Sequence, residues 1–163
     1  MADHLRDELS KMLDQYDERR RADVARERKM KDDDALFLTQ FAELRRSVVR
    51  PVFEAAGALL AERGHHFSIS EQEFGLGEGS KPTEAGISFT IVPLGMESPL
   101  YADHARSLSL TTRHYNKTVW LAAGRPLDAG GVAGSKGAFP LEKIDRQLVE
   151  DELVKFVAAT LVG

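Results

Sequence analysis

The sequence predicts an α+β fold: two N-terminal helices, a four-stranded antiparallel sheet, and a C-terminal helix packed on one face of the sheet. Three observations support this. Apolar residues recur every three or four positions up to residue 63, which is the period of a helix. Between residues 65 and 124 they alternate with serine and threonine, which is the period of a strand. The helical period returns from residue 140. We expect residues 1–33 to form a charged helical extension and residues 34–163 a single α+β domain.

The extension combines a short apolar stripe with a charged segment. Leu5, Leu9, Met12 and Tyr16 are spaced as one face of a helix. Residues 17–34 (DERRRADVARERKMKDDD) hold seven basic and seven acidic side chains, so their charges cancel. The stripe is too short to be stable alone. We therefore expect it to pack on the domain or on a second copy of the chain.

The charged segment is typical of a solvated helix. On a helix its acids lie three or four residues from basic groups. The expected ion pairs are Asp17–Arg21, Asp23–Arg26, Glu27–Lys31 and Arg28–Asp32. A nucleic-acid arm would keep its cations unpaired, because its affinity comes from releasing counterions from phosphate, and it would carry aromatic rings for stacking. The alternatives that remain open are such an arm and a helix that binds a partner.

A second apolar stripe predicts a longer helix that ends at Gly64. Its members are Phe37, Phe41, Leu44, Val48, Val52, Ala55 and Leu59. Asp32–Asp34 place negative charge where a helix start favours it. Pro51 should kink the helix near Ser47–Arg50. We expect a break at Asp32–Asp34 and a helical hairpin, rather than one rod on the order of 90 Å long.

Four segments alternate with period two and predict the strands of the sheet. They are HHFSIS, GISFTIV, RSLSLTTR and KTVWLAAG. Each has an apolar side and a Ser/Thr side, which indicates an antiparallel sheet that is wetted on one face. We expect Trp120, in the last of these strands, to be largely buried in the core.

The glycine-rich segment GRPLDAGGVAGSKGAF predicts a flexible connector before the last helix. That helix should begin at about Pro140, which suits a first turn. Its expected buried side is formed by Leu141, Ile144, Leu148, Leu153, Phe156 and Val157.

Composition narrows the functional classes. The chain has 163 residues, of which 42% are hydrophobic and 29% charged, as in soluble globular proteins. Its net charge of −4 disfavours a surface built for phosphate backbones. The absence of cysteine excludes disulfides, thiolate metal sites and cysteine nucleophiles. Residues 1–10 carry charges where a secretory signal needs an apolar run, and no stretch approaches the roughly 18 apolar residues of a membrane span. We expect a cytoplasmic protein with no membrane partner.

Two places are candidate ligand sites. In the glycine-rich segment, Ser135 and Lys136 precede the last helix and could hold an anion, although the P-loop pattern is not met. In TTRHYNKTVW, the side chains of Arg113, His114, Tyr115 and Trp120 gather near one hairpin end. Side chains of these types recur in pockets and interfaces. The competing interpretations are a flexible connector and a polar turn.

Catalytic and metal motifs give no candidates. The histidines are His4, His65, His66, His104 and His114. Their spacing does not match metal-binding patterns, and no serine lies in a G-x-S-x-G turn. We expect neither a metal nor a cofactor, and the sequence identifies no catalytic residue.

These observations favour a non-enzymatic interaction or adaptor protein. We expect a homo-oligomer that pairs through the N-terminal helices about a C2 axis, with a further protein partner as a second option. The alternative is a small-molecule or anion-binding domain, enzymatic or not, with its site at the residue 113–120 hairpin or the residue 130–140 loop. Nucleic-acid binding ranks third and is not expected.

Overall fold

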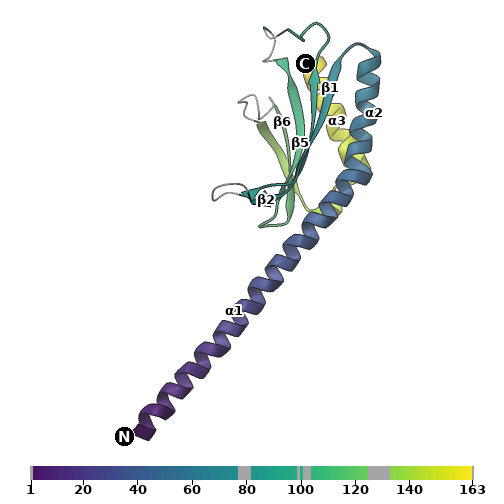
Figure 1. The fold of residues 1–163 in the computed structure, drawn as a ribbon. Coiled ribbons are helices and arrows are strands. Elements are labelled where there is room, and N and C mark those ends of the chain that lie inside the picture. The colour runs from purple at the N-terminus through teal and green to yellow at the C-terminus, as the bar shows by residue number, and fades with distance from the viewer. Residues whose placement is uncertain (1, 77–81, 99, 101–103, 125–132, 163) are drawn as a thin grey trace. The chain divides into compact units, whose positions relative to one another are not determined.

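The computed structural model describes residues 2–76, 82–98, 100, 104–124 and 133–162 (Figure 1). The chain forms two compact units, Met1–Leu36 and Phe37–Gly163. The fold is α+β, with a long N-terminal helix, a five-stranded antiparallel sheet and a C-terminal helix.

The first helix, α1, runs from Ala2 to Leu44 without a break. The expected break at Asp32–Asp34 and the helical hairpin are therefore wrong. Aspartate in a helix interior costs only a few tenths of a kcal/mol relative to alanine, and no glycine or proline precedes Pro51. Three adjacent acids are thus too weak a signal to end a helix.

Side chains of the first unit are solvated, and most of its expected ion pairs are not formed. Every residue from Ala2 to Asp33 is exposed. Of the four expected pairs, Asp23–Arg26 is formed, at 3.2 Å. The other three do not come within 4.0 Å among the described residues. A pair that was not expected joins Lys11 to Glu8 at 4.0 Å.

The helix is irregular where Pro51 predicts a disturbance. Residues Arg45–Val49 form a π-helix, η1, and the α-helical course resumes as α2, Arg50–Glu62. Proline lacks an N–H group, and its ring would meet the carbonyl oxygen four residues earlier in a regular α-helix. The wider π turn accommodates this ring. Gly64 follows the helix with φ of +89°, as a helix stop requires.

The π-helix holds one extra residue in its turn, so it shifts the face that points to the core. Phe37 and Phe41 are buried before it, Val49 at its last position, and Phe53 after it. An uninterrupted helix would have buried Val48, Ala55 and Leu59 instead. Of the predicted stripe, Phe37, Phe41 and Val52 are buried, whereas Ala55 and Leu59 are exposed, so the prediction is wrong at the C-terminal end of the stripe.

The main sheet has the strand order β1-β4-β5-β6-β7, and every pairing is antiparallel. The strands are β1 His66–Gln72, β4 Gly86–Val92, β5 Arg106–Arg113, β6 Thr118–Gly124 and β7 Ala133–Phe139. A short second sheet pairs β2, Gly75–Leu76, with β3, Pro82–Thr83.

The fifth strand corrects the prediction of four. Strand β7 lies in the segment predicted to be a flexible connector, where glycine, alanine and serine show no alternation. It pairs with β6 through an irregular register between Leu121 and Ala122, and Gly137 adopts a φ of +144°. Pairing with an existing edge, which is a tertiary effect, makes this segment a strand.

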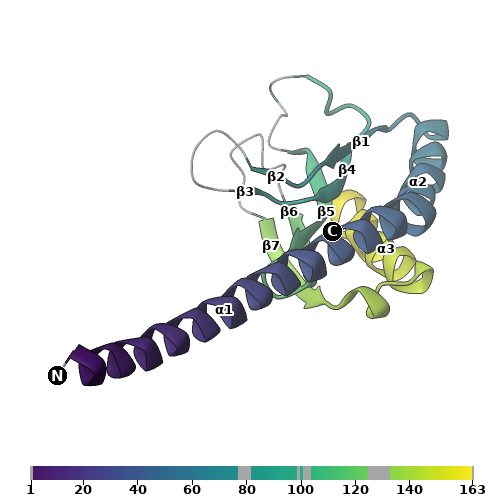
Figure 2. The same ribbon diagram turned by 60° about the horizontal axis from the view of Figure 1, so that its bottom comes forward.

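The sheet packs one face against the helices. Figures 1 and 2 show α2 and the C-terminal helix α3, Arg146–Leu161, on the same side of the sheet. The sheet's contribution to the core is Ile87, Phe89, Ile91, Leu108, Leu110, Val119 and Leu121. The opposite face carries hydroxyl groups, with Ser88–Ser109 at 2.9 Å and Thr90–Ser107 at 2.6 Å between oxygens. Ser107 and Ser109 are buried, so the centre of this face is not wetted as expected.

The C-terminal helix, α3, spans Arg146–Leu161. It therefore begins six residues after the predicted start at Pro140. Pro140 precedes a short 3-10 turn, Leu141–Lys143. The carboxylate of Asp145 accepts a hydrogen bond from the backbone N–H of Leu148 at 2.8 Å. Asp145 is therefore the N-cap, which sets the helix start.

Candidate functional site

An apolar groove lies between the helices that cover the sheet. One wall comes from η1 and α2 and the other from α3, and the groove has a volume of about 690 Å³. Its apolar lining is Val48, Pro51, Val52, Ala55, Ala56, Leu59, Leu60, Leu153, Val154, Val157 and Ala158. Leu59 is 65% exposed and Val154 69% exposed. Apolar side chains with this exposure, gathered along one groove, are typical of an interaction surface.

The π-helix produces this groove. Val48, Val52, Ala55 and Leu59 are the second half of the apolar stripe predicted for the core. Because the π turn rotates the following residues by about 100°, Phe53 takes a core position, and Ala55 and Leu59 face the groove, while Val52 is buried at the groove's floor. The α2 helix is consequently apolar on two sides, one that the sheet covers and one that lines the groove.

The charged side chains along the groove are paired with each other. Arg146 and Glu150, both in the lining, form an i,i+4 pair at 2.7 Å on α3. On α2, Arg50 and Glu54 pair in the same way at 2.8 Å. These pairs leave no excess of either sign beside the apolar floor.

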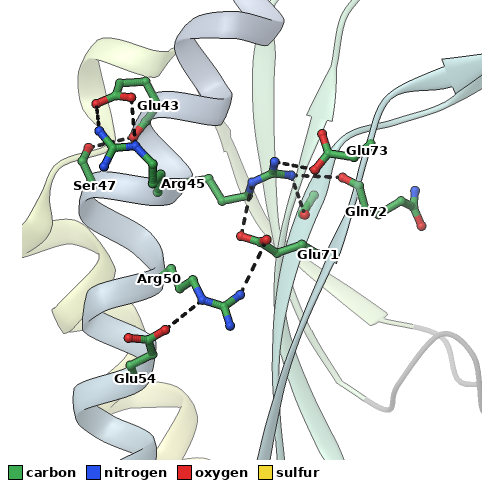
Figure 3. Close-up of polar contacts among 10 residues, drawn as sticks. Glu43, Arg45, Ser47, Arg50, Glu54, Glu71, Gln72 and Glu73 are labelled. Carbon is green, nitrogen blue, oxygen red and sulfur yellow. Dashed lines mark hydrogen bonds and ion pairs between the residues drawn. The ribbon is translucent and has the colours of Figure 1, made fainter.

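A buried arginine anchors η1 to the sheet (Figure 3). The Arg45 side chain is 8% exposed and lies 3.4 Å from Glu71 and 2.6 Å from Glu73. It also donates hydrogen bonds to the carbonyl oxygens of Gln72, at 3.1 Å, and Gly86, at 3.3 Å. Charge-assisted bonds of this kind are among the stronger ones in proteins. Arg45 therefore stabilises the π turn that exposes the groove.

The neighbouring arginines differ in their surroundings. Arg50 bridges Glu54 to Glu71, at 3.6 Å from the latter, and extends the network along α2 (Figure 3). Arg46 is exposed and pairs with Glu43 in its own helix, and this hydrogen bond raises the pKa of Arg46 above its usual value.

Two of the four hairpin candidates, Arg113 and Trp120, contact each other. The guanidinium carbon of Arg113 lies 3.2 Å from the centre of the Trp120 ring. Trp120 is 37% exposed, so the prediction that it is largely buried is wrong. It lies opposite Thr111 on the hydroxyl face, between Val119 and Leu121, which point to the core.

The other two hairpin candidates lie in the turn. His114 Nδ1 contacts Glu84 Oε1, and the His114 backbone N–H donates to Glu84 Oε2 at 3.0 Å. Tyr115 is 68% exposed, and its ring centre lies 6.0 Å from that of His114. Glu84 thus holds the turn through both the ring and the backbone of His114. These contacts stabilise the hairpin turn, as expected for the competing interpretation of this segment as a polar turn.

The anion candidates Ser135 and Lys136 lie within β7 and not in a loop before a helix. Ser135 is opposite Ala122 of β6. Successive N–H groups of a strand point in opposite directions and do not converge as they do at a helix start, so the anion-binding geometry of a loop ahead of a helix is absent at these residues. Their side chains lie outside the described part of the structure.

The sequence did not indicate Arg45, Glu84 or Val154 as site residues. Val154 follows the buried Leu153 and interrupts the helical period, which is a weak sign of a second apolar face. Arg45 lies six residues before Pro51, and the sequence gives no other indication of its role.

The described residues contain no group of three or more His, Asp or Glu side chains placed to hold a metal ion. Among the described helices, none combines the length and apolar composition needed to cross a membrane. Comparison with known protein families, curated proteins and solved structures finds no match to this chain.

Proposed function

We propose that this protein acts through protein–protein contacts, binding an amphipathic helix of a partner in the groove between α2 and α3, and that it self-associates through α1. The observation that carries the first part is the shift at η1, which turns Ala55 and Leu59 into the groove. A regular helix would have buried these two side chains against the sheet, whereas here they are exposed. A helix lying in a groove is a common mode of peptide recognition.

The groove indicates the chemistry of its occupant. The small side chains of Ala55, Ala56 and Ala158 allow close approach of another backbone. The exposed Leu59 and Val154 would contact apolar residues spaced at i, i+4 and i+7. Because the pairs Arg146–Glu150 and Arg50–Glu54 already balance the nearby charges, the affinity would come from apolar burial and depend little on salt.

A displayed library of random peptides, selected against the full-length protein, tests this proposal. We expect enriched peptides to have apolar residues at helical spacing. Their affinity should fall about tenfold or more with Leu59→Glu or Val154→Glu, because a charge would then face the buried apolar side. Leu100→Glu is the control, since Leu100 is 88% exposed and does not line the groove. Failure to enrich any helical pattern, or binding that groove substitutions leave unchanged, would overturn the proposal.

A further inference from the structure

The first unit exposes an apolar seam along α1. Leu5 is 61% exposed, Leu9 47%, Met12 59% and Tyr16 63%. Their 4-3-4 spacing continues through the next two helical heptads, at Arg19, Asp23, Arg26 and Met30. These eight residues are called the α1 seam. Its first four residues are apolar or aromatic, the next three, Arg19, Asp23 and Arg26, are charged, and Met30 closes it.

Charge is divided along the same helix. Residues 2–18 contain six acidic and two basic side chains, a net charge of −4. Residues 19–31 contain seven basic and two acidic side chains, a net charge of +5. Among the described residues of this unit, the ion pairs are Glu8–Lys11 and Asp23–Arg26, so the helix itself neutralises little of this separation.

Resting on the self-association proposed above, we propose that two copies pair their α1 seams in antiparallel orientation, with the acidic half of each copy against the basic half of the other. A pairing centred on the charge boundary places Leu5 of one copy opposite Met30 of the second. It places Tyr16 opposite Arg19, where a guanidinium can lie on an aromatic face. The Leu5–Met30 contact therefore forms twice, once at each end of the helix pair.

The residues that flank the seam fit the same alignment. In an antiparallel helix pair, flanking positions on the same side of the seam face each other. Arg6 then faces Glu27 of the second copy, and Glu8 faces Lys29. The two-fold axis repeats both pairs, so four attractive contacts form from two kinds of pair.

A parallel pairing in register would oppose like charges. Arg19, Asp23 and Arg26 would each face their own counterpart in the second copy. Like charges placed directly opposite are unfavourable and are a known means of excluding a wrong partner orientation. Charge therefore favours the antiparallel orientation, whereas the parallel pair would form additional apolar contacts at Leu9, Met12 and Tyr16.

Cysteine cross-linking of the full-length protein tests the orientation directly, because the chain has no cysteine of its own. We expect Leu5→Cys and Met30→Cys, each alone, to give no disulfide-linked dimer. In the antiparallel pair, two thiols at the same position lie about 37 Å apart along the helix, far beyond disulfide reach. Mixing the two variants before oxidation should give the mixed dimer. Asp14→Cys, on the outer side of α1, is the control for random collision. Dimers linked within each single variant would overturn the antiparallel orientation.

A charge exchange measures the electrostatic part. Glu8→Lys and Lys29→Glu should each weaken the dimer about tenfold in sedimentation equilibrium at low salt, and the double variant should restore it. A monomer up to about 100 µM would overturn both this inference and the self-association. Dissociation of the dimer by Leu59→Glu would show that the seam docks in the groove instead. That result would overturn the antiparallel pairing and leave the groove's role in binding standing.

Discussion

Replacing Arg45 by methionine tests whether the buried guanidinium holds the π turn against the sheet. Methionine keeps the apolar stem of the side chain but removes the guanidinium group with its charge and donors. The Gln72 and Gly86 carbonyl oxygens would lose a charged donor, and Glu71 would lose a partner 3.4 Å away. Glu73 is 73% exposed and would return to water at little cost.

The expected loss follows from these contacts. A hydrogen bond to a charged group contributes about 1.5–3 kcal/mol, and carbonyls within a strand keep some of their other partners. We therefore expect Arg45→Met to lower the free energy of unfolding by about 3 kcal/mol. For a unit of this size that corresponds to a fall in Tm of roughly 10 °C. Arg46→Met, at an exposed pair beside it, should leave the free energy of unfolding almost unchanged.

Urea unfolding followed by tryptophan fluorescence is the appropriate assay. Trp120 is the single tryptophan and lies in β6, so its emission reports the unit that contains the sheet and not the helical extension. The difference between the two variants should persist in about 1 M salt, because a buried network is screened much less than an exposed pair. Equal urea midpoints for Arg45→Met and Arg46→Met would refute the reasoning.

Four further results are expected. Trp120→Ala should cost only about 1–2 kcal/mol in urea unfolding followed by circular dichroism, because the ring is partly exposed; a loss above about 4 kcal/mol would show that the ring is a core element. Gly57→Ala should destabilise by about 1–3 kcal/mol despite the better helix propensity of alanine, since the added Cβ would overlap the ring of Phe67; calorimetry showing a higher Tm would contradict this. Leu59→Glu should leave Tm within a few degrees of the parent, because its side chain is already exposed, and a large fall would mean that the groove is part of the core. Labelled duplex and single strands should bind weakly or not at all at near-physiological salt, because acidic residues 2–18 oppose the attraction of residues 19–31; specific submicromolar binding would argue for a nucleic-acid role.

The strands in the middle of the sheet could be predicted from sequence because their environment has two distinct sides. In β4, Ile87, Phe89 and Ile91 alternate with Ser88 and Thr90, and each set has one face of the sheet to itself. Strand β7 lacks this pattern, so its state depends on the edge of β6. Trp120 misled the prediction by its size. Its place between Val119 and Leu121 was the better guide to its face.

The groove could be predicted only in part. Its α2 residues were recognised as one apolar stripe, and the disturbance at Pro51 was expected, but the sequence does not say whether a helix meets a proline by kinking or by a π turn. That choice depends on Arg45, whose partners come from β1 and β4. A one-residue change of phase then decided that Ala55 and Leu59 face the groove and not the sheet.

The π turn also determines which changes of length this helix can accept. Deleting Ser47 would remove the extra residue of η1 and leave Val49 and Phe53 facing the sheet, provided that Pro51 is replaced as well, because its ring would otherwise meet a carbonyl. Inserting a residue in the same turn would rotate α2 by about a further 100° and carry Phe53 out of the core. Variation in length at this point is therefore directional: shortening by one residue preserves the buried face, and lengthening by one destroys it.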